Sequence, residues 1–210
     1  MKRHDEFTFG VPWITEFFHQ DWTHDAPTAA EAVARQFPGE LDPAAVLLVR
    51  RDARLLLDHL APDRIEVLWE ACTAEESFFP RRAADGAEWM RRLTEVCDRW
   101  LSRRADTPAL SDADSYEGRE LAGPVLAEVE EFRSVIGSQV ADALTECARR
   151  CTPDLAFRFL LKVLPRKYFT PPDRYFHLTR EHYARLEDIG TALRYGEFVV
   201  SEVKYLVEDG

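Results

Sequence analysis

Residues 17–22 read FFHQDW, a string in which three aromatic rings flank a histidine, an amide and a carboxylate. The string could form a ligand shell, an acid–base pair, or the end of a helix packed onto a core. His24 and Asp25 follow closely, but the spacing H-x-D-x-x-H-D does not match the three or four converging ligands that divalent ions need. Local hydrogen bonds readily explain polar side chains beside a turn. We therefore expect Phe18 and Trp22 to be buried, and the polar residues between them to bond backbone groups near a helix end.

The sequence on both sides of this string predicts helices joined by short loops. Thr28 begins a capping-box pattern, Asp42-Pro43 combines an N-cap acid with a first-turn proline, and Asp85 precedes a helix with an apolar stripe. The apolar residues behind these starts recur with the period of an α-helix. We therefore predict that residues 1–104 form an all-α bundle of five helices.

The second half of the chain has a different pattern. Residues 105–118 contain proline, glycine and several acids, which predicts a linker to a C-terminal domain over residues 119–210. In that domain Thr179 signals a helix start, whereas residues 155–164 suit either a helix or a buried strand and residues 198–207 alternate as in a strand. These two segments could pair in an α+β domain, or the domain could be all-helical. The expected fold class is mainly α, with a C-terminal domain of either kind.

The composition is that of an ordinary globular chain with an acidic surface. Of 210 residues, 46% are hydrophobic and 31% are charged, and the formal net charge is −11. That charge disfavours direct binding to nucleic acid or to an anionic membrane, and it favours a basic partner. No apolar run is long enough to span a bilayer and no signal peptide is expected, which predicts a cytoplasmic protein. Reduced and buried thiols are then expected at Cys72, Cys97, Cys147 and Cys151.

The sequence lacks the patterns that usually carry catalysis or cofactor binding. It contains no glycine-rich phosphate loop and no G-x-S-x-G elbow. Glu181 and His182, with His177 nearby, lack the H-E-x-x-H order of a metallohydrolase helix. The acid pairs at 75–76 and 130–131 are typical of solvated surface. We therefore predict no catalytic residue, no cofactor site and no metal ligand.

The segments around FFHQDW resemble the contact-dependent growth inhibition immunity proteins of the CdiI type. Those proteins carry a Y/F-F-H-Q-D-W string before a capped helix, which here begins TAAEAVARQF. Further on, an aromatic pair with a proline precedes a glycine and a tryptophan-bearing helix; the family usually has tyrosines in that pair, where this chain has phenylalanines. The likeness covers about residues 12–103. Its motif residues, for which we expect a structural role, are Phe18, His19, Gln20, Asp21, Trp22, Phe79, Pro80, Gly86 and Trp89.

The resemblance implies a helical cytoplasmic protein without catalytic activity. Its expected partner is a cognate toxin domain, often a nuclease with a basic surface, which the immunity protein binds and neutralises by occluding the active site. Two other classes stay open on the residues alone. One is a hydrolase or transferase that depends on a metal or on carboxylates, using residues 19–25 or the region of His177 and His182. The other is a cytoplasmic helical adaptor that binds another protein.

Overall fold

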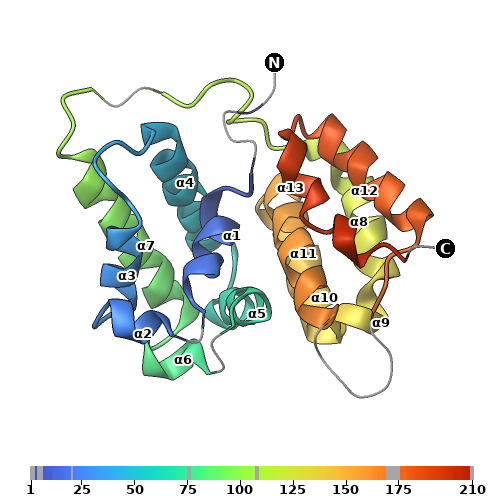
Figure 1. Ribbon diagram of the computed structural model, residues 1–210, viewed down its shortest axis with the longest axis horizontal. Helices are drawn as coiled ribbons and strands as arrows, with labels where there is room; N and C mark the ends of the chain where they lie inside the picture. The colour runs from blue at the N-terminus through green and yellow to red at the C-terminus, as the bar shows by residue number, and fades with distance from the viewer. Residues whose placement is uncertain are drawn as a thin grey trace. The chain divides into compact units, whose positions relative to one another are not determined.

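The computed structural model describes residues 3, 7–19, 21–74, 77–106, 109–168 and 176–208. These residues form a mainly helical protein without a β-strand, so the expected mainly α class is confirmed. The chain divides into two compact units (Figure 1). The N-terminal unit runs from Phe9 to Asp114, and the C-terminal unit combines the segment up to Thr8 with residues from Ser115 onwards. One boundary, between Asp114 and Ser115, lies within residues 105–118, the stretch expected to be a linker, and the other lies between Thr8 and Phe9.

The N-terminal unit is built around two long helices, α4 and α7, which pack side by side. Helix α1 packs against α4, while α3 and α5 pack against α7. Short helices α2 and α6 occur within stretches that the sequence indicates only as loops. In chain order the elements are α1 (Gly10–Ile14), the 3-10 helix η1 (Thr15–Phe17), α2 (Trp22–Asp25), α3 (Ala29–Arg35), α4 (Pro43–His59), α5 (Pro62–Cys72), α6 (Phe78–Arg81) and α7 (Gly86–Leu101).

The predicted helix starts of this unit are confirmed by their capping hydrogen bonds. The Thr28 hydroxyl accepts from the third amide of α3 at 3.2 Å. The Asp42 carboxylate accepts from an amide in the first turn of α4 at 2.8 Å, and Asp85 does the same for α7 at 2.7 Å. Each cap satisfies an amide that the helix itself leaves without an acceptor. Local sequence signals therefore suffice to place the three helices.

The C-terminal unit is built around one buried helix, α11. Helices α8 and α10 pack against it. Every residue from 151 to 164 is buried. A helix that is covered on all sides needs apolar residues all round, or charges that are paired. The elements are η2 (Arg119–Leu121), α8 (Ala122–Glu131), α9 (Arg133–Ile136), α10 (Ser138–Arg150), α11 (Pro153–Tyr168), α12 (Arg180–Ala192), α13 (Glu197–Ser201) and η3 (Lys204–Leu206).

The expectation of an α+β C-terminal domain is wrong, and the all-helical alternative agrees with the structure. Residues 155–164 belong to α11, and residues 198–207 form α13 and η3. Among the described residues, the β-type pairing is limited to an isolated parallel bridge between Leu178 and Val207. Because α11 is buried on all sides, its sequence is mostly apolar, and the same pattern is typical of a buried strand.

Two further expectations concern the chain as a whole. All four cysteines are buried free thiols, as predicted. No helix within the described ranges is long and apolar enough to cross a membrane.

Candidate functional site

The string FFHQDW occupies the connection between η1 and α2. Phe18 and Trp22 are buried, with exposed fractions of 0% and 2%, as expected. His19 and Asp21 are exposed, and Gln20 lies outside the described residues. The two buried rings meet edge to face with their centroids 5.1 Å apart. The string therefore has an inward apolar part and an outward polar part.

The buried part of the string belongs to an aromatic core made by α5, α6 and α7. The Phe18 ring lies 5.3 Å from Trp69, 5.3 Å from Phe78 and 5.7 Å from Trp89, measured between ring centroids. Trp69 and Trp89 are themselves 5.2 Å apart. Edge-to-face rings at such distances add stabilisation beyond that of their buried area. Two motif segments that are distant in sequence thus meet in one core.

Of the polar residues of the string that the structure describes, His19 makes local hydrogen bonds. The His19 Nδ1 accepts from the backbone amide of Asp21 at 3.3 Å, and the Trp22 amide donates to the His19 carbonyl oxygen at 3.3 Å. The side chain of Asp21, at the N-cap of α2, makes no capping hydrogen bond. His19 thus bonds a backbone amide beside the start of α2, as expected, whereas the exposed Asp21 side chain does not cap that helix.

The second motif segment begins at the aromatic pair before α7. Phe78 is fully buried, whereas Phe79 is half-buried and Pro80 is exposed. The centroids of the Phe79 and Phe78 rings lie 5.0 Å apart. The backbone amide of Phe79 donates to the Glu70 carboxylate at 3.4 Å. Only the first ring of the pair therefore reaches the aromatic core, and the second forms part of its rim.

Helices α5 and α7 approach each other closely at Gly86. A Cβ atom on this glycine would lie 2.5 Å from the Pro62 carbonyl oxygen and 2.7 Å from the Ile65 Cβ atom. Its amide donates to the Glu66 carboxylate at 3.1 Å. Both contacts require the backbone of α7 to lie against α5 without an intervening side chain. The close packing of α7 against α5 therefore explains why a glycine stands at position 86.

We expect Gly86→Ala to lower the free energy of unfolding by about 1–3 kcal/mol, the usual cost of forcing atoms into a packed contact. The measurement is urea unfolding followed by circular dichroism. Gly123→Ala is the matched control, because no atom lies within 4 Å of a Cβ at that position. The control is expected to be neutral or slightly stabilising, since alanine favours a helix over glycine. Equal effects of both substitutions would contradict the close approach.

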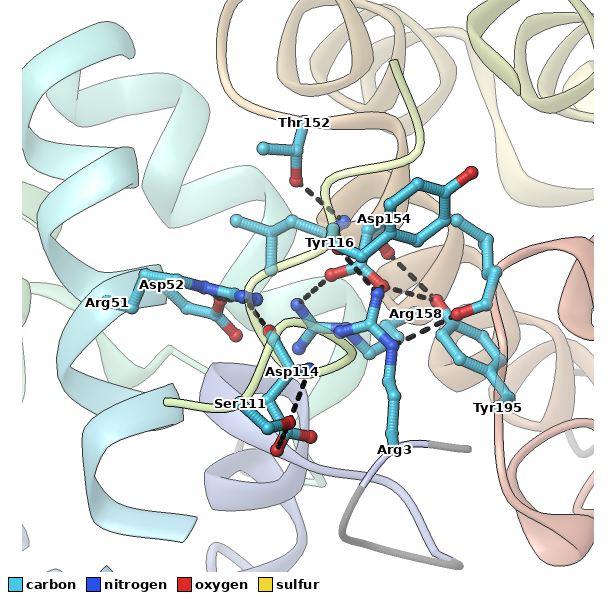
Figure 2. A network of polar contacts seen from close by, with 12 residues as sticks. Arg3, Arg51, Asp52, Ser111, Asp114, Tyr116, Thr152, Asp154, Arg158 and Tyr195 are labelled. Atoms are coloured by element: carbon cyan, nitrogen blue, oxygen red, sulfur yellow. Dashed lines mark hydrogen bonds and ion pairs between the residues drawn. The ribbon is translucent and has the colours of Figure 1, made fainter. Parts of the chain in front are cut away.

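A buried polar network at Asp154 is the main polar feature of the C-terminal unit (Figure 2). The Asp154 carboxylate lies 2.8 Å from the Arg3 guanidinium and 2.8 Å from that of Arg158, with all three side chains fully buried. The Tyr195 hydroxyl donates to the same carboxylate at 3.0 Å. One buried negative charge is thus shared by two cations and a phenol, which offsets its desolvation.

The same network fixes the N-terminal segment onto this unit. The Arg3 Nε donates to the Leu193 carbonyl oxygen at 3.0 Å, and the Arg3 amide donates to the Arg194 carbonyl oxygen at 3.1 Å. Further along, the Thr8 hydroxyl donates to Glu202 at 2.9 Å, and that glutamate also pairs with Lys162. Residues that precede the N-terminal unit in sequence therefore complete the core of the other unit.

A smaller network lies inside the N-terminal unit. The carboxylate of Asp52, on α4, accepts from the Val11 amide in the first turn of α1 at 3.1 Å. Arg51 pairs with the same carboxylate at 3.0 Å and donates to the Asp114 carbonyl oxygen. Ser111 in turn donates to the Asp114 carboxylate at 2.5 Å (Figure 2). This network anchors a helix start and the end of the unit, so its charges have structural roles.

The remaining histidines and acids singled out by the sequence do not converge. His24 and Asp25 are exposed on α2. His182 completes the capping box of α12, and its Nε2 lies 3.1 Å from the Glu131 carboxylate. Within the part of the chain that the structure describes, no three His, Cys, Asp or Glu side chains are arranged to hold a metal ion. Glu75 and Glu76 lie outside the described residues.

Three buried groups have pKa values that are raised above their ordinary range. Burial raises the pKa of the Cys97 thiol from 9.0 to about 12, and that of the Tyr183 phenol from 10.0 to about 12. Burial, together with the neighbouring Asp154 carboxylate, raises the pKa of Tyr195 well above 10.0. In each case the folded state holds the proton more tightly than the unfolded chain does.

We therefore expect the free energy of unfolding to fall as the pH rises above about 9. A raised pKa in the folded state stabilises it fully below the unfolded pKa, and this contribution is lost as the pH approaches the folded pKa of about 12. Urea unfolding between about pH 8 and about pH 11 measures the slope. Cys97→Ala and Tyr183→Phe should each flatten it. A slope that both variants leave unchanged would contradict the assignment.

No known protein family, curated protein or solved structure matches the chain. The candidate site therefore rests on the geometry of the described residues alone. The described residues form an aromatic core and two internal polar networks.

Proposed function

We propose that the chain is an immunity protein that binds a cognate toxin domain in the cytoplasm and neutralises it by occluding its active site. The observation that carries this proposal is that Phe18 and Trp22 from the first motif segment and Trp89 from the second belong to one aromatic core. The centroid of the Phe18 ring lies 5.1 Å from that of Trp22 and 5.7 Å from that of Trp89, and all three side chains are buried. Such a string serves as a fold signature, which leaves the outer surface to vary with the partner.

The charge of the N-terminal unit supports a basic partner. Residues 9–114 contain 20 aspartates and glutamates against 12 basic residues, all of which are arginine. Nuclease toxins need a basic surface to hold phosphates, and an acidic inhibitor can occupy the same surface. Charge complementarity of this kind accelerates association more than it strengthens the final complex. The acids are therefore expected to act mainly on the association rate.

Three buried acids take no part in this exterior charge. Asp52 and Asp154 are held in the two internal networks. Glu128, with an exposed fraction of 5%, receives two hydrogen bonds from Arg185 at 2.6 and 3.2 Å. Partners inside the fold neutralise these three carboxylates, so the surface acids provide the field that a partner meets. Apolar groups at the centre of a contact would then control dissociation.

The test uses the toxin domains encoded beside the gene for this chain. We expect one of them to form an equimolar complex with the purified chain and to lose its enzymatic activity in that complex. The association rate should fall by roughly tenfold between roughly 50 mM and roughly 500 mM salt, because screening weakens electrostatic steering. A toxin domain from an unrelated gene cluster is the control and should retain its activity. The proposal fails if no neighbouring toxin domain is bound and inhibited.

A further inference from the structure

A surface hollow of about 400 Å³ is lined by residues from the C-terminal half of α12 and from α13. Two glycines shape it. A Cβ atom on Gly190 would lie 2.4 Å from a methyl group of Val200, so the two helices touch at this point. Gly196, at the N-cap of α13, forms another part of the wall without a side chain. The helices touch at Gly190 and Val200, and Gly196 has no side chain to fill the space beside this contact. A hollow that is open to solvent therefore remains.

The polar groups around the hollow favour a cationic ligand. Glu187 and Glu197 contribute carboxylates, and Thr191 and Ser201 contribute hydroxyl groups, which can accept hydrogen bonds. Arg194 is the single cation of the lining, and its guanidinium stacks over the Tyr116 ring at 4.6 Å. Two negative charges against one positive charge leave the hollow net negative. A lysine or arginine side chain would satisfy these acceptors.

Exposed aromatic rings lie on the same unit. Phe198, which follows Glu197 in α13, stacks on Phe7 with the ring centroids 4.9 Å apart. Their exposed fractions are 40% and 62%, and that of Tyr205 is 55%. Across the described parts of the chain, these three are the large hydrophobic side chains that remain exposed. Aromatic residues of this kind are enriched in the energetic centres of protein interfaces, and their faces attract cations.

We propose that the α12–α13 hollow, with the Phe7–Phe198 stack, binds a basic segment of a partner protein. One lysine or arginine side chain of that segment enters the hollow between Glu187 and Glu197, and the flanking residues cover the aromatic stack. The inference rests on the proposed function, because it assigns the segment to the toxin domain. It gives the C-terminal unit a share of the binding surface, although the likeness to immunity proteins covers only the other unit.

The first measurement does not depend on the toxin. Amide resonances of the full-length chain are followed by NMR during titration with a short arginine-rich peptide. The amides of Gly190, Gly196 and Ser201 are expected to shift, and Glu187→Lys with Glu197→Lys is expected to abolish those shifts. An aspartate-rich peptide of equal length is the control. Unchanged resonances of these three amides at millimolar arginine-rich peptide would overturn the proposal.

The second measurement separates this inference from the proposed function. The probe is the neighbouring toxin domain, made catalytically inactive, and its affinity for the chain is measured by calorimetry. We expect the Glu187→Lys, Glu197→Lys variant to bind at least tenfold more weakly than the wild type. Glu181→Lys, on the same helix with a side chain that is 86% exposed, should bind normally.

Each outcome of the calorimetry has one meaning. If the wild type and the double variant bind the toxin equally well, the hollow is not the contact and the proposed function stands. If the wild type binds no neighbouring toxin, the proposed function fails and the assignment of the segment to a toxin fails with it. Weakening by Glu181→Lys as strong as that by the double variant would show a general charge effect and overturn the specific site.

Discussion

Trp89→Ala is expected to lower the free energy of unfolding by about 3–5 kcal/mol, the usual cost of removing a large buried aromatic side chain. The Trp89 ring is fully buried and contacts the rings of Phe18, Trp69 and Phe78 within 5.7 Å, measured between centroids. Its removal leaves a cavity among rigid rings that cannot easily close. Urea unfolding followed by circular dichroism gives the change. A loss of this size is a large part of the total stability of a domain.

His19→Ala is the matched control for this prediction. His19 belongs to the same motif but is exposed, and its side chain makes one local hydrogen bond. We expect a change of less than about 0.5 kcal/mol, as for most surface substitutions. The structural role of the motif would be contradicted by a Trp89→Ala protein that unfolds like the wild type but no longer binds its partner.

Asp154→Ala is expected to lower the free energy of unfolding by about 3–5 kcal/mol, because removal of one partner leaves buried charges uncompensated. The guanidinium groups of Arg3 and Arg158 both lose their carboxylate, and the Tyr195 hydroxyl loses an acceptor. Urea unfolding measures this change as well. Limited proteolysis should in addition cut the N-terminal segment faster, since Arg3 is one of its anchors.

Glu146→Gln is the control for the buried network. Glu146 pairs with Arg150 at 2.7 Å on the surface of α10, where the arginine side chain is 59% exposed. Exposed pairs contribute about 0–1 kcal/mol. The Asp154 network would have no special structural role if both substitutions changed the stability by less than about 1 kcal/mol.

Helix starts were predictable because their signals are local. Thr28, Asp42 and Asp85 each bond an amide within three residues in sequence, so the short segment contains both partners. The burial of Phe18 and Trp22 could also be predicted, since a string with aromatic residues beside a turn needs a core to cover it. The contribution of Trp69 was missed, because its place in the same core depends on how α5 packs.

The helical nature of the C-terminal unit was harder to predict. Residues 199–207 alternate in sequence, yet the buried positions are Val199, Val200, Val203 and Leu206, which follow a helical period. In α11 the helix was indicated by the spacing of the charged residues and not by the apolar residues. Asp154, Arg158 and Lys162 are spaced four apart, which places them on one face of a helix.

The polar networks could not be predicted, because their partners are distant in sequence. Arg3 and Asp154 are separated by about 150 residues, and nothing near either residue indicates the other. The same holds for the hollow between α12 and α13. Gly190 looks like an ordinary helix interruption in the sequence, and only the position of Val200 shows that the helices touch there.

We propose that this chain protects a cell by binding a toxin domain. The most direct test is growth of bacteria that produce the toxin domain encoded beside the gene, with and without this chain. We predict that the toxin domain alone stops growth, and that co-production of the wild-type chain restores it. Continued growth arrest in the presence of a folded, abundant chain would contradict the account.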